Sequence, residues 1–86
     1  MKTVSEVELD NGDIIVENEH GLSWLVTKVP GDTNLHRVIF NYERLALSTK
    51  EDAIVIACAF AHKFKEAKVE EMHNMLLEQN PRYDSA

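Results

Sequence analysis

The sequence predicts an α+β fold in which a four-stranded antiparallel β-meander is followed by a long C-terminal helix. Short segments of alternating apolar and polar residues, separated by turn residues, fill the first half of the 86-residue chain, as expected for strands. The second half contains neither glycine nor proline between Ser48 and Asn80, as expected for a helix. Strands followed by a helix that covers one face of their sheet make a two-layer α+β domain.

The first two predicted strands, residues 3–9 and 13–19, form a hairpin around Asn11-Gly12. This dipeptide favours a two-residue type I′ turn, in which both central residues have positive φ. Such a turn places Leu9 opposite Ile14, so that the apolar side chains share one face and the acidic side chains share the other. The predicted acidic face consists of Glu6, Glu8, Asp10, Asp13, Glu17 and Glu19.

The third and fourth predicted strands are residues 22–29 and 35–43, which are rich in β-branched and aromatic residues. The turn His20-Gly21 precedes the third strand, and a loop over residues 30–34 with Pro, Gly, Asp and Asn separates the two strands. Residues 43–47 are compatible either with the end of the fourth strand or with a link into the helix.

The predicted helix covers about residues 49–79. Ser48 and Glu51 have the spacing of a capping box, in which each side chain bonds the other residue's backbone amide. Pro81 ends the helix, because proline cannot continue the helical hydrogen bonding. We therefore expect a single domain over residues 1–80, followed by a flexible tail over residues 81–86.

The apolar pattern of this helix changes beyond Lys68, where Val69 and Met72 leave the line set by Phe60 and Phe64. Either the helix bends or splits near residues 63–68 and stays on the same core, or a second copy of the chain covers its far side. The sequence leaves the continuity of the helix open, and we favour a homodimer. The predicted dimer interface is Ile54, Val55, Cys58, Ala59, Val69, Met72 and Leu76.

Composition excludes several function classes. Fifteen acidic and nine basic residues give a formal net charge of −6, which opposes direct binding to nucleic acid. No apolar segment approaches the roughly 20 residues that a membrane-spanning helix needs, so we expect no membrane contact. The only cysteine, Cys58, cannot form an internal disulfide, and this favours a reducing, cytoplasmic setting.

Tests for catalytic or metal-binding residues find only weak candidates. Cys58 and His62 are four residues apart on the predicted helix and could hold two metal ligands or a nucleophile and its base. The chain has no second cysteine, and the other histidines lack metal-type spacing. We therefore expect no enzyme activity, no metal and no cofactor.

The charge distribution leads to the functional hypothesis. Residues 1–20 contain six acids and only Lys2 as a base, so the predicted acidic face suits a basic partner protein, above all one that binds nucleic acid. The chain would then be an inhibitor or DNA mimic. As a class only, it resembles small acidic accessory proteins of viruses and mobile elements.

The alternative hypothesis is a homo-oligomeric interaction or assembly module that acts through its apolar C-terminal helix. In that case the acids serve solubility alone. Mimicry of DNA requires the acids to share one face of the hairpin, so the register of this hairpin is a direct test of that part of the hypothesis.

Overall fold

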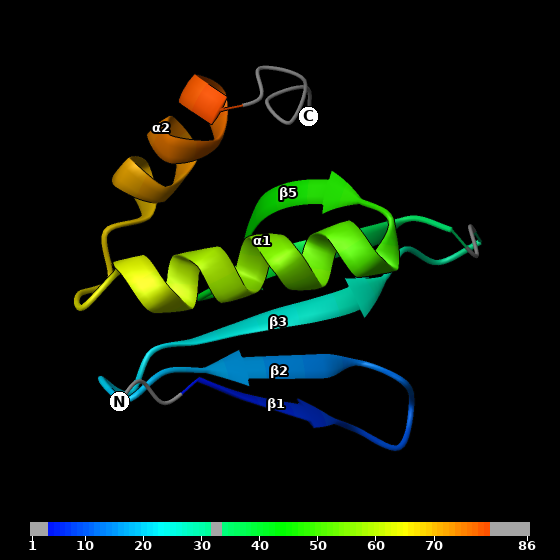
Figure 1. Ribbon diagram of the computed structural model, residues 1–86. Coiled ribbons are helices and arrows are strands. Elements are labelled where there is room, and N and C mark those ends of the chain that lie inside the picture. Colours follow the sequence, from blue (N-terminus) through cyan, green and yellow to red (C-terminus); the bar gives the residue numbers. More distant parts are fainter. Residues whose placement is uncertain (1–3, 32–33, 80–86) are drawn as a thin grey trace.

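The computed structural model describes residues 4–31 and 34–79, which form an antiparallel sheet and two helices (Figure 1). The predicted α+β class is confirmed, with five strands and two helices in this part of the chain in place of four strands and one helix. The predicted tail over residues 81–86 lies outside the described residues. The elements are β1 (Ser5–Glu8), β2 (Ile14–Glu17), β3 (Ser23–Lys28), β4 (His36–Phe40), β5 (Glu43–Ser48), α1 (Lys50–Lys63) and α2 (Val69–Gln79).

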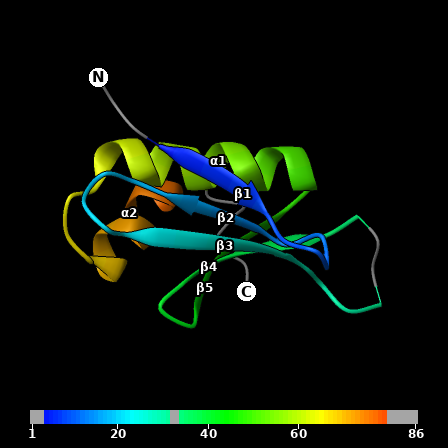
Figure 2. The ribbon, with the colours of Figure 1, turned by 90° about the horizontal axis from the view of Figure 1, so that it is seen from below.

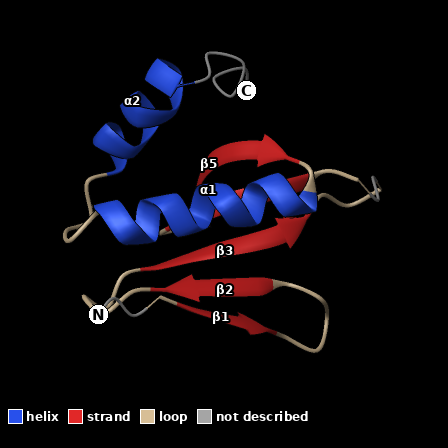
Figure 3. Ribbon diagram, viewed as in Figure 1, coloured by secondary structure: helices blue, strands red, loops and turns tan. Residues whose placement is uncertain are grey.

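The strands follow one another in the sheet in chain order, and each neighbouring pair is antiparallel. Figure 3 shows β1, β2 and β3 side by side with alternating directions. The predicted fourth strand, residues 35–43, contains β4 and the two turn residues Asn41 and Tyr42, and the segment 43–47 that the sequence left open belongs to a fifth strand, β5. Both turn residues have positive φ, 52° and 68°, as a tight two-residue hairpin turn requires. Sequence inspection missed this turn because no glycine marks it, and tyrosine rarely adopts this conformation.

Helix α1 begins one residue later than predicted. Thr49 is the N-cap, and its hydroxyl accepts a hydrogen bond from the backbone N–H of Asp52 at 3.3 Å. Ser48, the predicted cap, is the last residue of β5 and pairs with His36 of β4. The acidic first turn is present, with Glu51 beside Asp52, where the helix dipole favours negative charge.

The predicted long helix is split between Lys63 and Val69, within the region where the apolar pattern changes. Asn18, at the end of β2, explains the position of the split. Its side-chain amide donates to the carbonyl oxygens of Ala61 at 3.1 Å and Phe64 at 2.9 Å, satisfying acceptors that α1 leaves open at its C-terminus. Neither helix of the described chain is long and apolar enough to cross a membrane.

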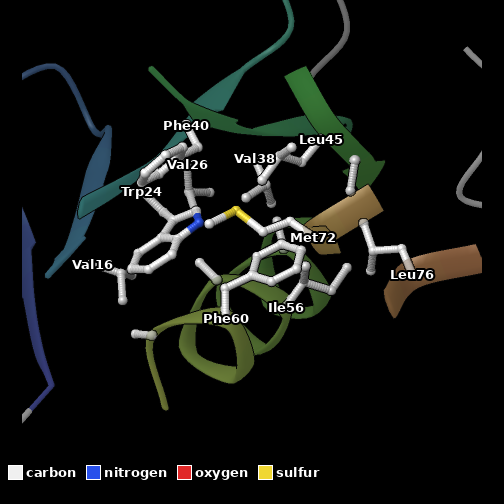
Figure 4. Close-up of a cluster of buried hydrophobic side chains, with 14 of the residues drawn as sticks. Val16, Trp24, Val26, Val38, Phe40, Leu45, Ile56, Phe60, Met72 and Leu76 are labelled. Atoms are coloured by element: carbon white, nitrogen blue, oxygen red, sulfur yellow. The ribbon is translucent and has the colours of Figure 1, made fainter. Parts of the chain in front are cut away.

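The hydrophobic core lies between α1 and the sheet and is closed by α2. Trp24 of β3 is fully buried, with its ring centroid 5.1 Å from that of Phe40 and 6.2 Å from that of Phe60. Met72 and Leu76 bring α2 onto the same cluster (Figure 4). The second half of the predicted helix therefore bends back onto the core of its own chain.

The opposite face of the sheet carries no helix or strand among the described residues. Figure 2 shows α1 along one side of the sheet only. We call the other side the open face. Cross-strand pairing places on it Val7, Ile15, Glu17, Ser23, Leu25, Thr27, Arg37, Ile39, Arg44 and Leu47.

Candidate protein-binding surface

The register of the first hairpin differs by one residue from the predicted register. Glu8 pairs with Ile14 and Glu6 with Val16, so both glutamates lie on the same face as buried apolar residues. The turn contains three residues, not two: the Leu9 N–H donates to the Asp13 carbonyl at 2.7 Å, and only Gly12 has positive φ, at 93°. A shift of one residue moves every side chain of the strand to the other face.

The predicted single acidic face is therefore wrong. Glu6 and Glu8 lie on the helix side of β1, whereas Glu17 lies on the open face. Asp13 also points to the open face, where its carboxylate accepts a hydrogen bond of 2.9 Å from the Thr27 hydroxyl. Asp10 is in the turn at one end of the hairpin, and Glu19 is in the turn at the other end.

These six acids nevertheless all lie on the β1–β2 hairpin or in the turns at its two ends. All except Asp13, which is half-buried, are exposed, and β1 is exposed along its whole length at the edge of the sheet. We call the β1–β2 hairpin with these six acids the acidic edge. Its charge projects from both faces of a two-stranded ribbon, so the hairpin presents a charged edge and not a flat charged face.

Almost the whole net charge of the protein belongs to this hairpin. Residues 1–20 carry −5 of the formal net charge of −6, and residues 21–86 carry the remaining −1. No lysine or arginine occurs between Val4 and Thr27. At the acidic edge, His20 lies 3.4 Å from the Glu19 carboxylate, and this contact is an ion pair only when the histidine is protonated.

A side-chain hydrogen bond connects an acid of the acidic edge to α1. The Cys58 thiol donates a hydrogen bond to the Glu6 carboxylate at 3.2 Å. Burial, and then the hydrogen bond and negative charge of Glu6, raise the pKa of the Cys58 thiol to about 11. A thiol that stays protonated at neutral pH is a poor nucleophile and a poor metal ligand, which argues against both sequence-based roles of Cys58.

We expect Cys58 to react slowly with iodoacetamide at pH 7.5, because the thiolate that attacks forms only towards pH 11. The alkylation rate should rise about tenfold per pH unit between pH 8 and pH 10. Glu6→Gln removes the adjacent charge and should accelerate alkylation at pH 8. Mass spectrometry measures the rates, and the urea-unfolded chain is the control. Equal rates for the folded and unfolded chains would contradict the shielding of this thiol.

The described residues contain no group of three or more His, Cys, Asp or Glu side chains placed to hold a metal ion. His62, the proposed companion of Cys58, is exposed on α1. The geometry thus offers no support for the catalytic and metal-binding alternatives that the sequence raised.

The predicted dimer interface does not form a continuous exposed surface. Met72 and Leu76 are buried inside the chain, because the split lets α2 fold back onto the core. Ile54, Cys58 and Val69 are half-buried against the same core. Only Val55, which is 65% exposed, and Ala59 lie outside. Two short side chains make a small apolar surface.

Sequence inspection missed Asn18, the buried residue that orients the hairpin against α1. Its Oδ1 accepts from the backbone N–H groups of His20 and Leu22, at 2.9 and 3.1 Å, while its amide holds the end of α1. The available signal was alternation: position 18 continues the inward-facing series of Ile14 and Val16. A polar residue at such a position needs hydrogen-bond partners.

Comparison with protein-family models, with curated proteins and with solved structures finds no match for this chain. Charge and geometry are therefore the basis for a functional proposal.

Proposed function

We propose that this chain is a non-enzymatic binding protein whose acidic edge contacts a basic surface on another protein. One observation carries the proposal: five-sixths of the net charge belongs to residues 1–20, whose outer strand β1 is exposed along its length, and no lysine or arginine occurs between Val4 and Thr27. A surface that served solubility alone would mix the two signs of charge. A concentrated negative field instead steers a basic partner and raises its association rate.

Nucleic-acid-binding proteins are the partner class that best suits this field, because their binding sites are positively charged. Acids on both faces of a ribbon suit a groove with two basic walls better than a flat basic surface. We therefore propose that the hairpin enters such a groove and inhibits nucleic-acid binding by occupying it. The register does not support a ladder of carboxylates on one face, so close mimicry of a DNA backbone is not part of the proposal.

We also propose a reducing, cytoplasmic location, because Cys58 has no second cysteine in these 86 residues with which to pair. With a net charge of −6, direct binding of the chain to nucleic acid is not proposed.

The proposal predicts strongly salt-dependent binding. The tagged protein is used to capture partners from a lysate of its native cell in about 50 mM salt, and partners released in about 500 mM salt are identified. For a purified partner, we expect the affinity to fall at least about tenfold between these salt concentrations, because screening weakens contacts between exposed charges. An affinity that is independent of salt would contradict the proposal.

A matched pair of variants locates the contact. Glu8→Lys/Asp10→Lys/Glu17→Lys reverses three charges on the acidic edge and should weaken binding to the purified partner by about a hundredfold or more. Glu43→Lys/Glu66→Lys/Glu78→Lys makes the same change in net charge at exposed positions elsewhere and should weaken it much less. Circular dichroism checks that both variants fold. Equal losses would show that net charge, and not the hairpin, controls binding.

A further inference from the structure

The open face carries a row of four apolar side chains that runs across four strands. Val7 pairs with Ile15, Ile15 with Leu25, and Leu25 with Ile39, so these residues are direct neighbours on one face. Val7 is 52% exposed, and the other three are half-buried although no described element covers them. A hollow of about 300 Å³ lies beside this row, lined in part by Leu25, Ile39 and Tyr42.

A second row on the open face is polar and has opposite charges on its two sides. The Thr27 hydroxyl bonds Asp13 beside β2, and Thr27 pairs with Arg37 of β4. The Nε of Arg37 is buried and has no hydrogen-bond partner. Arg44 of β5 pairs with Ile39 and therefore adds a second positive charge to the same face. Acids therefore lie on the β1–β2 side of the face and arginines on the β4–β5 side.

We propose that the open face binds a second copy of this chain. The pattern on the face is self-complementary about a two-fold axis that lies between the two sheets and runs parallel to β3. This rotation places Leu25 over Leu25 of the other copy and Ile15 over Ile39. It also places Asp13 over Arg37, which provides a carboxylate for a guanidinium that has an unpartnered nitrogen.

Charge distinguishes this arrangement from the other face-to-face dimer. A two-fold axis perpendicular to the strands would bring the acidic edge of one copy over the acidic edge of the other, and like charges would oppose association. The axis parallel to the strands brings each acidic side over an arginine side. Charge complementarity therefore favours a second copy in one specific orientation. This dimer covers the open-face side of the acidic edge, so it and the proposed complex with a basic partner are alternative states of the chain.

The size of the face sets the expected affinity. Five strands about 4.8 Å apart, with about five residues each at 3.3 Å, give a flat area of roughly 400 Å². A standard interface buries roughly 800 Å² per partner, so this dimer should be weak. We expect dissociation in the micromolar range, with a net charge of −6 on each copy contributing to the weakness.

Sedimentation equilibrium of the full chain over about 10 μM to 1 mM tests the proposal. Leu25→Glu places like charges on the two-fold axis and should leave only monomer over this range. Val55→Glu makes the same chemical change on the exposed side of α1 and should dimerise like the unmodified chain. Circular dichroism confirms that both variants fold.

A charge exchange tests the orientation. Arg37→Glu should raise the dissociation constant about tenfold by placing a carboxylate opposite Asp13, and Asp13→Arg/Arg37→Glu should recover most of that loss. A chain that remains monomeric at about 1 mM would overturn the proposal. Loss of the dimer in Val55→Glu but not in Leu25→Glu would assign the contact to α1 and overturn it as well. Failure of the double variant to recover would exclude the proposed axis.

Discussion

Replacing Trp24 by alanine is expected to reduce the free energy of unfolding by about 3–5 kcal/mol. Trp24 has no exposed surface and lies between the rings of Phe40 and Phe60. Alanine would remove the largest buried side chain of the core and leave a cavity where sheet and helix meet. A small domain has a total stability of about 5–15 kcal/mol, so this variant should be largely unfolded or close to it.

Urea and thermal denaturation followed by circular dichroism measure the effect. A loss of this size should lower the melting temperature by roughly 15 °C or more in a chain of this length. Val55→Ala is the control, because Val55 is mostly exposed, and it should change stability by less than about 0.5 kcal/mol. If Trp24→Ala melted within a few degrees of the unmodified chain, Trp24 would not be the centre of the core.

Trp24→Phe separates packing from polarity at the same site. The indole Nε1 of Trp24 is buried without a hydrogen-bond partner, and an unsatisfied buried donor destabilises the folded state. Phenylalanine keeps an aromatic ring and removes this donor, although it leaves a smaller cavity. We therefore expect Trp24→Phe to lose about 1–2 kcal/mol, well below the loss for alanine.

Much of the fold follows from local sequence signals. Alternation of apolar residues located β2 and β3, and the absence of glycine and proline located the helical region. β5 was not assigned as a strand because its turn, Asn41-Tyr42, adopts positive φ without glycine. Such a turn is stabilised by the pairing of the strands on either side of it. The dipeptide alone does not show that these two segments pair.

The candidate site was predictable in composition but not in geometry. Counting charges correctly assigned the acids to the first hairpin. Their distribution over two faces depends on whether the turn has two residues or three, and Asn11-Gly12 is compatible with both. One residue in a turn therefore decides whether six acids form one surface or surround an edge.

The split of the helix could not be located by propensity either. No glycine or proline occurs in residues 64–68. The position of the split is explained instead by Asn18, which lies 46 residues before Phe64 and belongs to neither helix. The change of apolar pattern beyond Lys68 did indicate that the second half packs differently. The apolar periodicity thus indicated that the two halves of the helix pack differently. The residue that bonds the end of α1, Asn18, could be recognised only from the folded structure.

Asn18→Asp is expected to reduce the free energy of unfolding by about 3 kcal/mol or more at pH 7. The amide of Asn18 donates to the carbonyl oxygens of Ala61 and Phe64 in a buried site. Aspartate has nearly the same shape, but its carboxylate would face two carbonyl oxygens with no proton to donate. This repulsion acts where β2, the turn before β3 and the end of α1 meet, so it should destabilise the whole domain.

The loss should depend on pH. Burial beside two carbonyl oxygens raises the pKa of the introduced carboxyl above its unfolded value of about 3.9. The penalty is therefore fully present above the folded-state pKa and decreases as the pH falls through it, because the protonated acid can donate to one carbonyl. Urea unfolding of the variant and the unmodified chain at pH 7 and pH 4.5 should show a smaller difference at the lower pH.

Two controls separate this effect from general acid sensitivity. Asn74→Asp makes the same change at an exposed position of α2 and should change stability by less than about 0.5 kcal/mol at either pH. Asn18→Ala removes the same two donors without adding a charge, so its loss should be nearly independent of pH. A loss for Asn18→Asp that was equally large at both pH values would show that the carboxylate is hydrated, and that Asn18 does not seal the end of α1 from water.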